Sequence, residues 1–221
     1  MRAVAIESLG NPARVLELPT PNPAPGEVLV KIQTASVNGF DLAVAAGVLE
    51  GAMEHRFPVV LGKDFAGIVE AVGEGVTHFA PGEPVFGVVM KPYLGDGSFA
   101  LGDGSFAEYV TVPEQYGIER LPNSLDPATA GALGLAGSAA LAAIDAAAVR
   151  SGDTVLVSGA TGGVGALVVQ YAQNAGATVV ARDVPGTKRT SCATSAPATS
   201  STTPATWQPR FAPSPLTVWR L

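Results

Sequence analysis

The sequence predicts an α/β protein with a β-barrel, in which an all-β amino-terminal part precedes a strand–helix–strand unit. The first observation is a series of short strand patterns separated by Gly- and Pro-rich turns, which is typical of a small barrel or sandwich. The second is a glycine loop between an apolar strand and an amphipathic helix. The third is composition: 47% of the 221 residues are hydrophobic, which is enough for a buried core.

The strand patterns of the first part come at intervals along the chain. They cover Arg2–Ile6, Glu27–Thr34, Phe65–Val72, Val85–Val89 and Phe106–Val112. Alternation of apolar and polar residues in the second of them indicates a partly buried strand.

A helical stretch begins after residue 121. Asp126 is a natural N-cap and Pro127 a natural first helical residue. Glycines at 131, 134 and 137 weaken the pattern, so we expect a helix broken into pieces that ends near Val149.

The clearest unit follows. Thr154–Ser158 is a buried strand, Val164–Asn174 an amphipathic helix and Ala177–Ala181 a second strand. The loop between the first two has glycines at 159, 162 and 165, a GxxGxxG spacing. Such glycines permit a tight turn, close approach of a pyrophosphate and tight helix–strand packing.

The loop predicts a dinucleotide site at the helix N-terminus, where free N–H groups face phosphates. Gly162, Gly163 and Val164 would meet the pyrophosphate, with Gly159 and Gly165 shaping the loop. The alternative is a glycine-rich turn that binds nothing. Arg182 and Asp183 follow the second strand, where an acid selects NAD and an Arg selects NADP, so they leave the cofactor open.

Charge and composition exclude several classes. The formal net charge of −6 argues against a nucleic-acid partner. We find no apolar run long enough to span a bilayer and no signal-peptide pattern at the N-terminus. A single cysteine, Cys192, rules out an internal disulfide and a cysteine zinc cage, so a cytoplasmic location is expected.

Four segments together carry a family resemblance. They are LGKDFAGIVEAVGEGV at 61–76, PGEPVFG at 81–87, GSFAEYV at 104–110 and GDTVLVSGATGGVGALVVQYA at 152–172. In this order they resemble a medium-chain dehydrogenase/reductase of the quinone oxidoreductase group. The resemblance implies a GroES-like domain over 1–122, an incomplete Rossmann dinucleotide-binding domain over 123–182 and an active site between them. The remaining residues, 183–221, depart from the pattern and are expected to be a disordered tail.

The resemblance also bears on metal. Zinc-dependent members carry a Cys where this chain has Asn38 and a His where it has Lys63. An ammonium cannot ligate zinc without losing its proton, and no thiolate is present there. His55 and His78 match no ligand position. We therefore expect no metal site.

Hydride transfer from NADPH, or from NADH, is the chemistry that remains, with the protein providing orientation and electrostatics. Asn38 could donate a hydrogen bond to the substrate; the alternative is a loop residue that caps its own backbone. Ser138 matches a Thr at the cofactor cleft of relatives, or is a hydroxyl at a helix break. Asp41 is expected to be the N-cap of a helix after this loop.

Two features depart from the family. LGDGSFA occurs twice in succession, at 94–100 and 101–107, and the extra copy is expected to form a surface loop, or else to reshape substrate access. Residues 190–206 contain only Thr, Ser, Ala, Pro and one Cys, and residues 184–221 contain no carboxylate. We interpret the tail as a reading-frame shift, because a one-base shift of G/C-rich codons for Pro185–Gln208 can restore a family-like continuation. The coding DNA tests this interpretation.

Three functions follow as hypotheses. The first is an NAD(P)H-dependent oxidoreductase that reduces quinones or α,β-unsaturated carbonyls and has a small-molecule substrate. The second is an inactive remnant with a folded GroES-like domain, and we expect little or no turnover from these 221 residues. The third is a protein that binds partners through its basic tail. Relatives often dimerise through late Rossmann strands, which this chain lacks, so the oligomeric state stays open.

Overall fold

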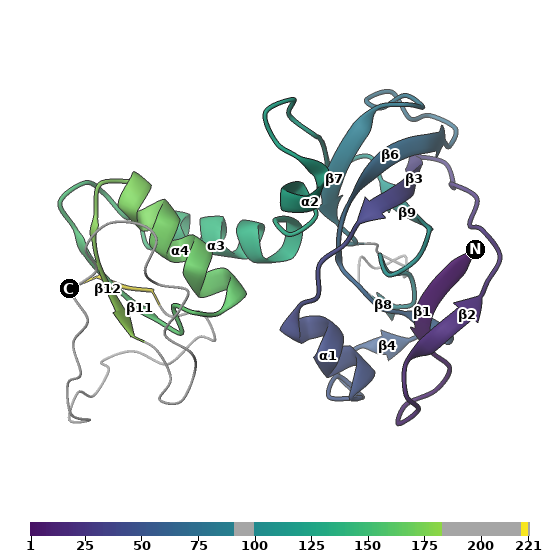
Figure 1. The fold of residues 1–221 in the computed structure, drawn as a ribbon, viewed down its shortest axis with the longest axis horizontal. Coiled ribbons are helices and arrows are strands. Elements are labelled where there is room, and N and C mark those ends of the chain that lie inside the picture. Colours follow the sequence, from purple (N-terminus) through teal and green to yellow (C-terminus); the bar gives the residue numbers. More distant parts are fainter. Residues whose placement is uncertain (91–99, 183–217, 221) are drawn as a thin grey trace. The chain divides into compact units, whose positions relative to one another are not determined.

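The computed structural model describes residues 1–90 and 100–182 and the backbone of 218–220 (Figure 1). Two compact units make up the chain, Met1–Leu135 and Ala136–Leu221. Among the described residues, no helix combines the length and the apolar character needed to cross a membrane.

A five-stranded antiparallel sheet forms the centre of the first unit, in the order β10-β7-β6-β3-β9. Its strands are β3 (Glu27–Thr34), β6 (Asp64–Val72), β7 (Pro84–Val88), β9 (Tyr109–Pro113) and β10 (Ile118–Arg120). The sheet curls around one side of a hydrophobic core (Figure 1). This confirms the barrel part of the predicted fold class.

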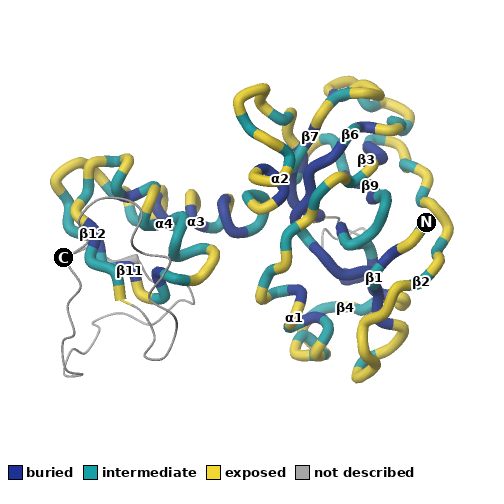
Figure 2. The backbone as a smooth tube through the Cα atoms, in the orientation of Figure 1, coloured by how far each residue is buried: buried dark blue, intermediate teal, exposed yellow. Residues whose placement is uncertain are grey.

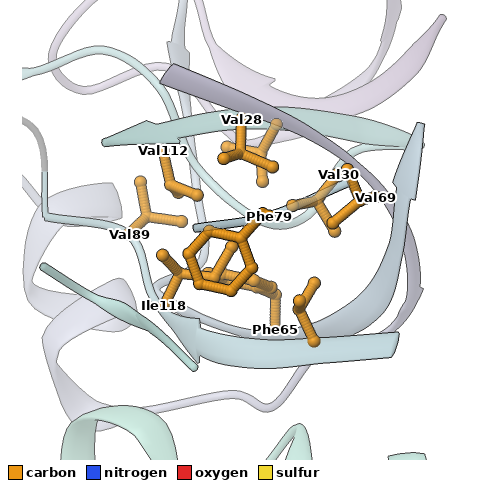
Figure 3. Packing of buried hydrophobic residues seen from close by; sticks show 10 residues of the cluster. Val28, Val30, Phe65, Val69, Phe79, Val89, Val112 and Ile118 are labelled. Carbon is orange, nitrogen blue, oxygen red and sulfur yellow. The ribbon is translucent and has the colours of Figure 1, made fainter. Parts of the chain in front are cut away.

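The core of this sheet consists mainly of β-branched and aromatic side chains (Figure 3). Its largest fully buried side chain is Phe65, which packs with valines of β3, β6, β7 and β9. The burial of β6 contrasts with the exposure of β2 (Arg14–Glu17) (Figure 2). Strand β3 is more buried than its alternating sequence pattern predicted, because Glu27 to Val30 are all buried.

Smaller elements complete the first unit. They are β1 (Arg2–Ile6), β5 (Val59–Val60), the pair β4 (Glu54–His55) and β8 (Ala100–Leu101), and the helix α1 (Gly39–Ala45). Strand β1 pairs with β2 on one side and β5 on the other. A second core cluster, which includes Ile6, Val44 and Leu101, joins these elements.

The predicted strand Phe106–Val112 is wrong at its start, since β9 begins at Tyr109. The Phe106 N–H donates to the Leu61 carbonyl, and the Phe106 carbonyl accepts from the Val4 N–H. These bonds tie the segment to β1 and to the residues after β5, so it cannot continue the β9 ladder.

The helical stretch is broken as predicted, into α2 (Pro127–Ala130) and α3 (Gly134–Ala146). Asp126 caps α2 by accepting the Thr129 N–H at 3.0 Å. The Thr34 hydroxyl donates to the Pro127 carbonyl at 2.6 Å, which fastens α2 to the curled sheet. The first compact unit ends at Leu135, and the domain limit expected at 122 stays a prediction.

The second unit contains the predicted crossover. Strands β11 (Thr154–Ser158) and β12 (Thr178–Arg182) are parallel, and α4 (Gly163–Asn174) connects them. Val155, Val157, Val168 and Val179 are buried between the helices and the sheet. On its other side β11 pairs antiparallel with β13 (Val218–Arg220), which gives the order β12-β11-β13.

Several predictions fall on residues outside the described part. They concern the first LGDGSFA copy up to residue 99, Asp183 and most of the tail with Cys192. The second copy packs inside the first unit, where Leu101 and Ser105 are buried. Neither the loop prediction for the extra copy nor the frame-shift interpretation is tested by the fold.

Candidate active site

The glycine loop begins where β11 ends. Gly159 has φ +75°, and its N–H donates to the Arg182 carbonyl at 2.9 Å, so the chain turns sharply out of the sheet. A Cβ on Gly165 would lie 2.2 Å from the Gly159 carbonyl oxygen. Only glycine at 165 therefore lets the first turn of α4 pack against the loop.

The other side of the loop is open. Gly162, which is the N-cap of α4, and Gly163 are exposed, and a Cβ on Gly163 would meet only the Ala136 Cβ at 3.6 Å. Among the described residues, no acceptor is found for the N–H groups of Gly163, Val164 and Gly165. Free N–H groups beside glycines, at the positive end of a 12-residue helix, suit a pyrophosphate.

The remaining cofactor-side predictions lie near this loop or beyond it. Ser138 is exposed on α3, in the same unit as the loop. Arg182 ends β12, and its carbonyl also accepts the Ala160 N–H. Asp183, the other residue considered for the choice between NADPH and NADH, lies outside the described residues.

In the first unit, a buried carboxylate organises the segment around Asn38. Asp64 is fully buried and accepts hydrogen bonds from the Ser36 hydroxyl at 2.5 Å and the Asn38 amide at 2.8 Å. Its other oxygen accepts the Leu135 N–H at 2.5 Å. We call this set of residues the Asp64 cluster. It holds the start of α1 and the start of α3 to the same strand, β6.

Asn38, not Asp41, is the N-cap of α1, which corrects the prediction for Asp41. Asp41 is the third helical residue, and its carboxylate accepts the Asn38 N–H at 2.7 Å in a capping box. The sequence pattern Asn-x-x-Asp fits this arrangement, with the shorter acid in place of Glu. Asn38 is half-buried, so its amide is committed to Asp64 and Ser36 while one side stays accessible.

Beside this cap lies a shallow recess, partly open to solvent, whose enclosed space is about that of one water molecule. We call it the Lys63 pocket, and its lining includes Phe40, Asp41, Val59, Lys63, Leu101 and Asp103. Burial raises the pKa of Asp41, although the hydrogen bond from Asn38 opposes this. Burial also lowers the pKa of the Lys63 ammonium, against the charges of Asp41 and Asp103.

These side chains do not suit zinc. Within residues 1–90 and 100–182, no group of three or more His, Cys, Asp or Glu is placed to hold a metal ion. Asn38 uses its amide as a donor to Asp64, and Lys63 has only an amine to offer. Neither is a usual zinc ligand.

Sequence reasoning found the glycine loop and Asn38 but missed the organising role of Asp64 and the pocket at Lys63. In the sequence, Lys63 is noted only as the substitute for a metal-binding histidine. The available signal was an Asp that directly precedes a buried strand, since a buried acid needs several donors. The structure places Asn38 in the first unit and the glycine loop and Ser138 in the second.

The family model of the Alcohol dehydrogenase GroES-like domain matches residues 24–123. This match contains the curled sheet, α1, Asn38, Lys63 and Asp64.

Three relatives describe the similarity over more of the chain. The chloroplast envelope quinone oxidoreductase homolog of Arabidopsis thaliana is 34% identical over 190 residues, which cover 82% of this chain and 55% of that protein. The acryloyl-coenzyme A reductase of Metallosphaera sedula is 33% identical, over 81% of this chain and 58% of that protein. A mycobacterial protein solved in complex with NADPH superposes with a TM-score of 0.69 at 30% identity, over 82% of this chain and 52% of that chain.

The fold and the matches define a dehydrogenase-type chain with a GroES-like domain, followed by a parallel strand–helix–strand unit. The chain belongs to the medium-chain dehydrogenase/reductase family, in its quinone oxidoreductase group. It spans about half the length of the curated relatives that it matches.

Proposed function

We propose that the chain is an NAD(P)H-dependent, zinc-independent oxidoreductase that reduces quinones or α,β-unsaturated carbonyls. The observation that carries the proposal is the open N-terminus of α4, with unpaired N–H groups at Gly163, Val164 and Gly165 in the described residues. A bound nicotinamide would supply the hydride. The family supports the oxidoreductase class, and the remaining details are inferred.

The glycine loop would hold the cofactor through its pyrophosphate. Three N–H groups and the helix dipole provide the positive end, and Gly162 and Gly163 let the phosphate oxygens approach the backbone. NADPH is favoured by the mycobacterial complex, whereas a relative named NAD-dependent alcohol dehydrogenase keeps NADH as an alternative.

On the substrate side, we propose Asn38 as a hydrogen-bond donor that would exchange its 3.3 Å bond to the Ser36 hydroxyl for a bond to the substrate and keep its 2.8 Å bond to Asp64. Its amide is oriented by Asp64 and its backbone by Asp41, so it is held without any metal. The names of two relatives, a quinone oxidoreductase homolog and an acryloyl-coenzyme A reductase, favour electron-poor double bonds as substrates. A small-molecule substrate, no nucleic-acid or membrane partner and a cytoplasmic location are part of the same proposal.

A second candidate is a chain that binds the dinucleotide but turns nothing over. A doubly wound dinucleotide domain has two halves. The described residues of the second unit supply one parallel strand pair, with β13 antiparallel beside it. This arrangement favours binding without an assembled nicotinamide site.

One experiment separates the two candidates. NADPH binding is measured by calorimetry, and NADPH oxidation is followed by absorbance with a simple quinone and with a small enone. The oxidoreductase predicts NADPH binding together with quinone-dependent oxidation, and the second candidate predicts binding with little or no turnover. Robust quinone-dependent oxidation would establish the enzyme and exclude the second candidate. Failure of both assays would contradict both candidates.

A further inference from the structure

Strand β12 is an open edge of its sheet. In the order β12-β11-β13, β11 lies between the other two strands, and among the described residues no strand pairs with the outer side of β12. The Thr178 N–H donates to the Asp153 carbonyl, on the β11 side. Because successive peptide groups of a strand point to opposite sides, Val179 and Ala181 direct their N–H and C=O groups outward. These groups are suited to the backbone of another strand.

The residues of β12 lack the charges that protect two edges of the first unit. Strand β2 begins with Arg14 and ends with Glu17, and Arg14 forms an ion pair with Glu7 at 3.5 Å. Strand β10 ends with Glu119 and Arg120. In β12 the sequence TVVAR has one charge, at its last position, after three consecutive apolar residues. Charged residues on an edge oppose pairing with another chain, whereas valine and threonine favour strands. Of these three edges, β12 is therefore the one best suited to accept a strand.

We propose that two copies of the chain associate by antiparallel pairing of β12 with β12, which forms one continuous sheet across a two-fold axis. The register that pairs all five residues places Val180 opposite Val180 of the second copy, Val179 opposite Ala181 and Thr178 opposite Arg182. The outward groups of Val179 and Ala181 then bond each other, as an antiparallel ladder requires. A shift by one residue would place them opposite peptide groups that point toward β11. This inference requires neither NADPH nor turnover, so it extends beyond the proposed function.

The side chains of β12 are complementary to a second copy in this register. Val180 is half-buried, and it would pack against its own copy at a position where antiparallel neighbours come closest. Val179 stays in the core of its own unit. The two Arg182 side chains lie at opposite ends of the paired segment, about 13 Å apart along the strands, and each faces an uncharged Thr178. No like charges meet, and because each copy offers one such edge, the association closes at a dimer.

The test is sedimentation velocity of the full chain over a series of concentrations. It is run without NADPH and with a reducing agent, so that Cys192 cannot link two copies. We expect an equilibrium between monomer and dimer, with no larger species. A181P removes an N–H that points outward and leaves the β12–β11 ladder intact, so this variant should be folded by circular dichroism and monomeric. Q170A, an exposed change on α4, is the control and should dimerise like the parent.

Two charge variants at one exposed position test the register itself. T178K places like charges opposite each other at both ends of the pairing, so the dissociation constant of the dimer should rise at least about tenfold. T178E faces Arg182 with an opposite charge and should lower the constant about threefold, and high salt should reduce both effects.

Four results would each overturn the proposal. They are a parent chain that stays monomeric at every concentration, species larger than a dimer, unchanged dimerisation of folded A181P, and equal dissociation constants for T178K and T178E. NADPH binding is measured on the same variants by calorimetry. Because the dimer forms without the cofactor, failure of the proposed function would leave this test intact.

Discussion

Replacing Asp64 by leucine is expected to lower the free energy of unfolding of the first unit by about 3–5 kcal/mol. Leucine is close to aspartate in size but accepts no hydrogen bond. The Ser36 hydroxyl, the Asn38 amide and the Leu135 N–H would each lose an acceptor inside a buried site. Such a loss is large compared with the stability of a typical domain.

The measurement is equilibrium urea unfolding followed by circular dichroism. Glu70 provides the matched control, because it lies on the same strand, is exposed and can receive the same substitution. E70L should change stability by no more than about 0.5 kcal/mol. D64N should fall between the two, since one oxygen still accepts the Leu135 N–H. Equal stability of D64L and E70L would show that the Asp64 cluster does not stabilise the first unit.

Replacing Gly104 by alanine is expected to cost about 2–4 kcal/mol. A Cβ at this position would lie 2.2 Å from the Val60 carbonyl oxygen and 2.3 Å from that of Leu61. Both contacts are to backbone, so no side-chain rotation can relieve them. The loop after β8 would have to move away from β5, and the buried Ser105 would move with it.

Gly39 is the comparison for Gly104. It begins α1, and a Cβ there would have nothing within 4 Å. G39A should therefore be neutral or slightly stabilising, because alanine favours a helix. Thermal unfolding of both variants beside the parent chain makes the comparison. If G104A melted at the parent temperature, the second LGDGSFA copy could not be packed as described.

The elements with strong periodicity were predicted well. Two predicted strands match the structure residue for residue, Thr154–Ser158 and Glu27–Thr34. Apolar and alternating runs of this length are typical of buried and half-buried strands. The Asp126 cap was also predicted, because a local side-chain hydrogen bond determines it. The glycine loop was also predicted from local sequence, because its glycines, the strand before them and the helix after them are consecutive in the chain.

Features that depend on distant partners were not predicted. The two-residue strands β4, β5 and β8 carry too little pattern and form only because their partners are in place. Phe106 had strand character but is bonded to Leu61 and Val4. The role of Asp64 was not predicted, because its donors Ser36, Asn38 and Leu135 lie far from it along the chain.

The central claim is that the open N-terminus of α4 binds a nicotinamide dinucleotide, and calorimetric titration with NADPH tests it most directly. G163A places a methyl group in the cradle while meeting only Ala136, so it should stay folded and bind at least about tenfold more weakly. G165A should instead destabilise the second unit, because its Cβ meets the Gly159 carbonyl. Q170A, an exposed change farther along α4, should bind like the parent. No binding by the parent chain, or equal binding by folded G163A, would contradict the claim.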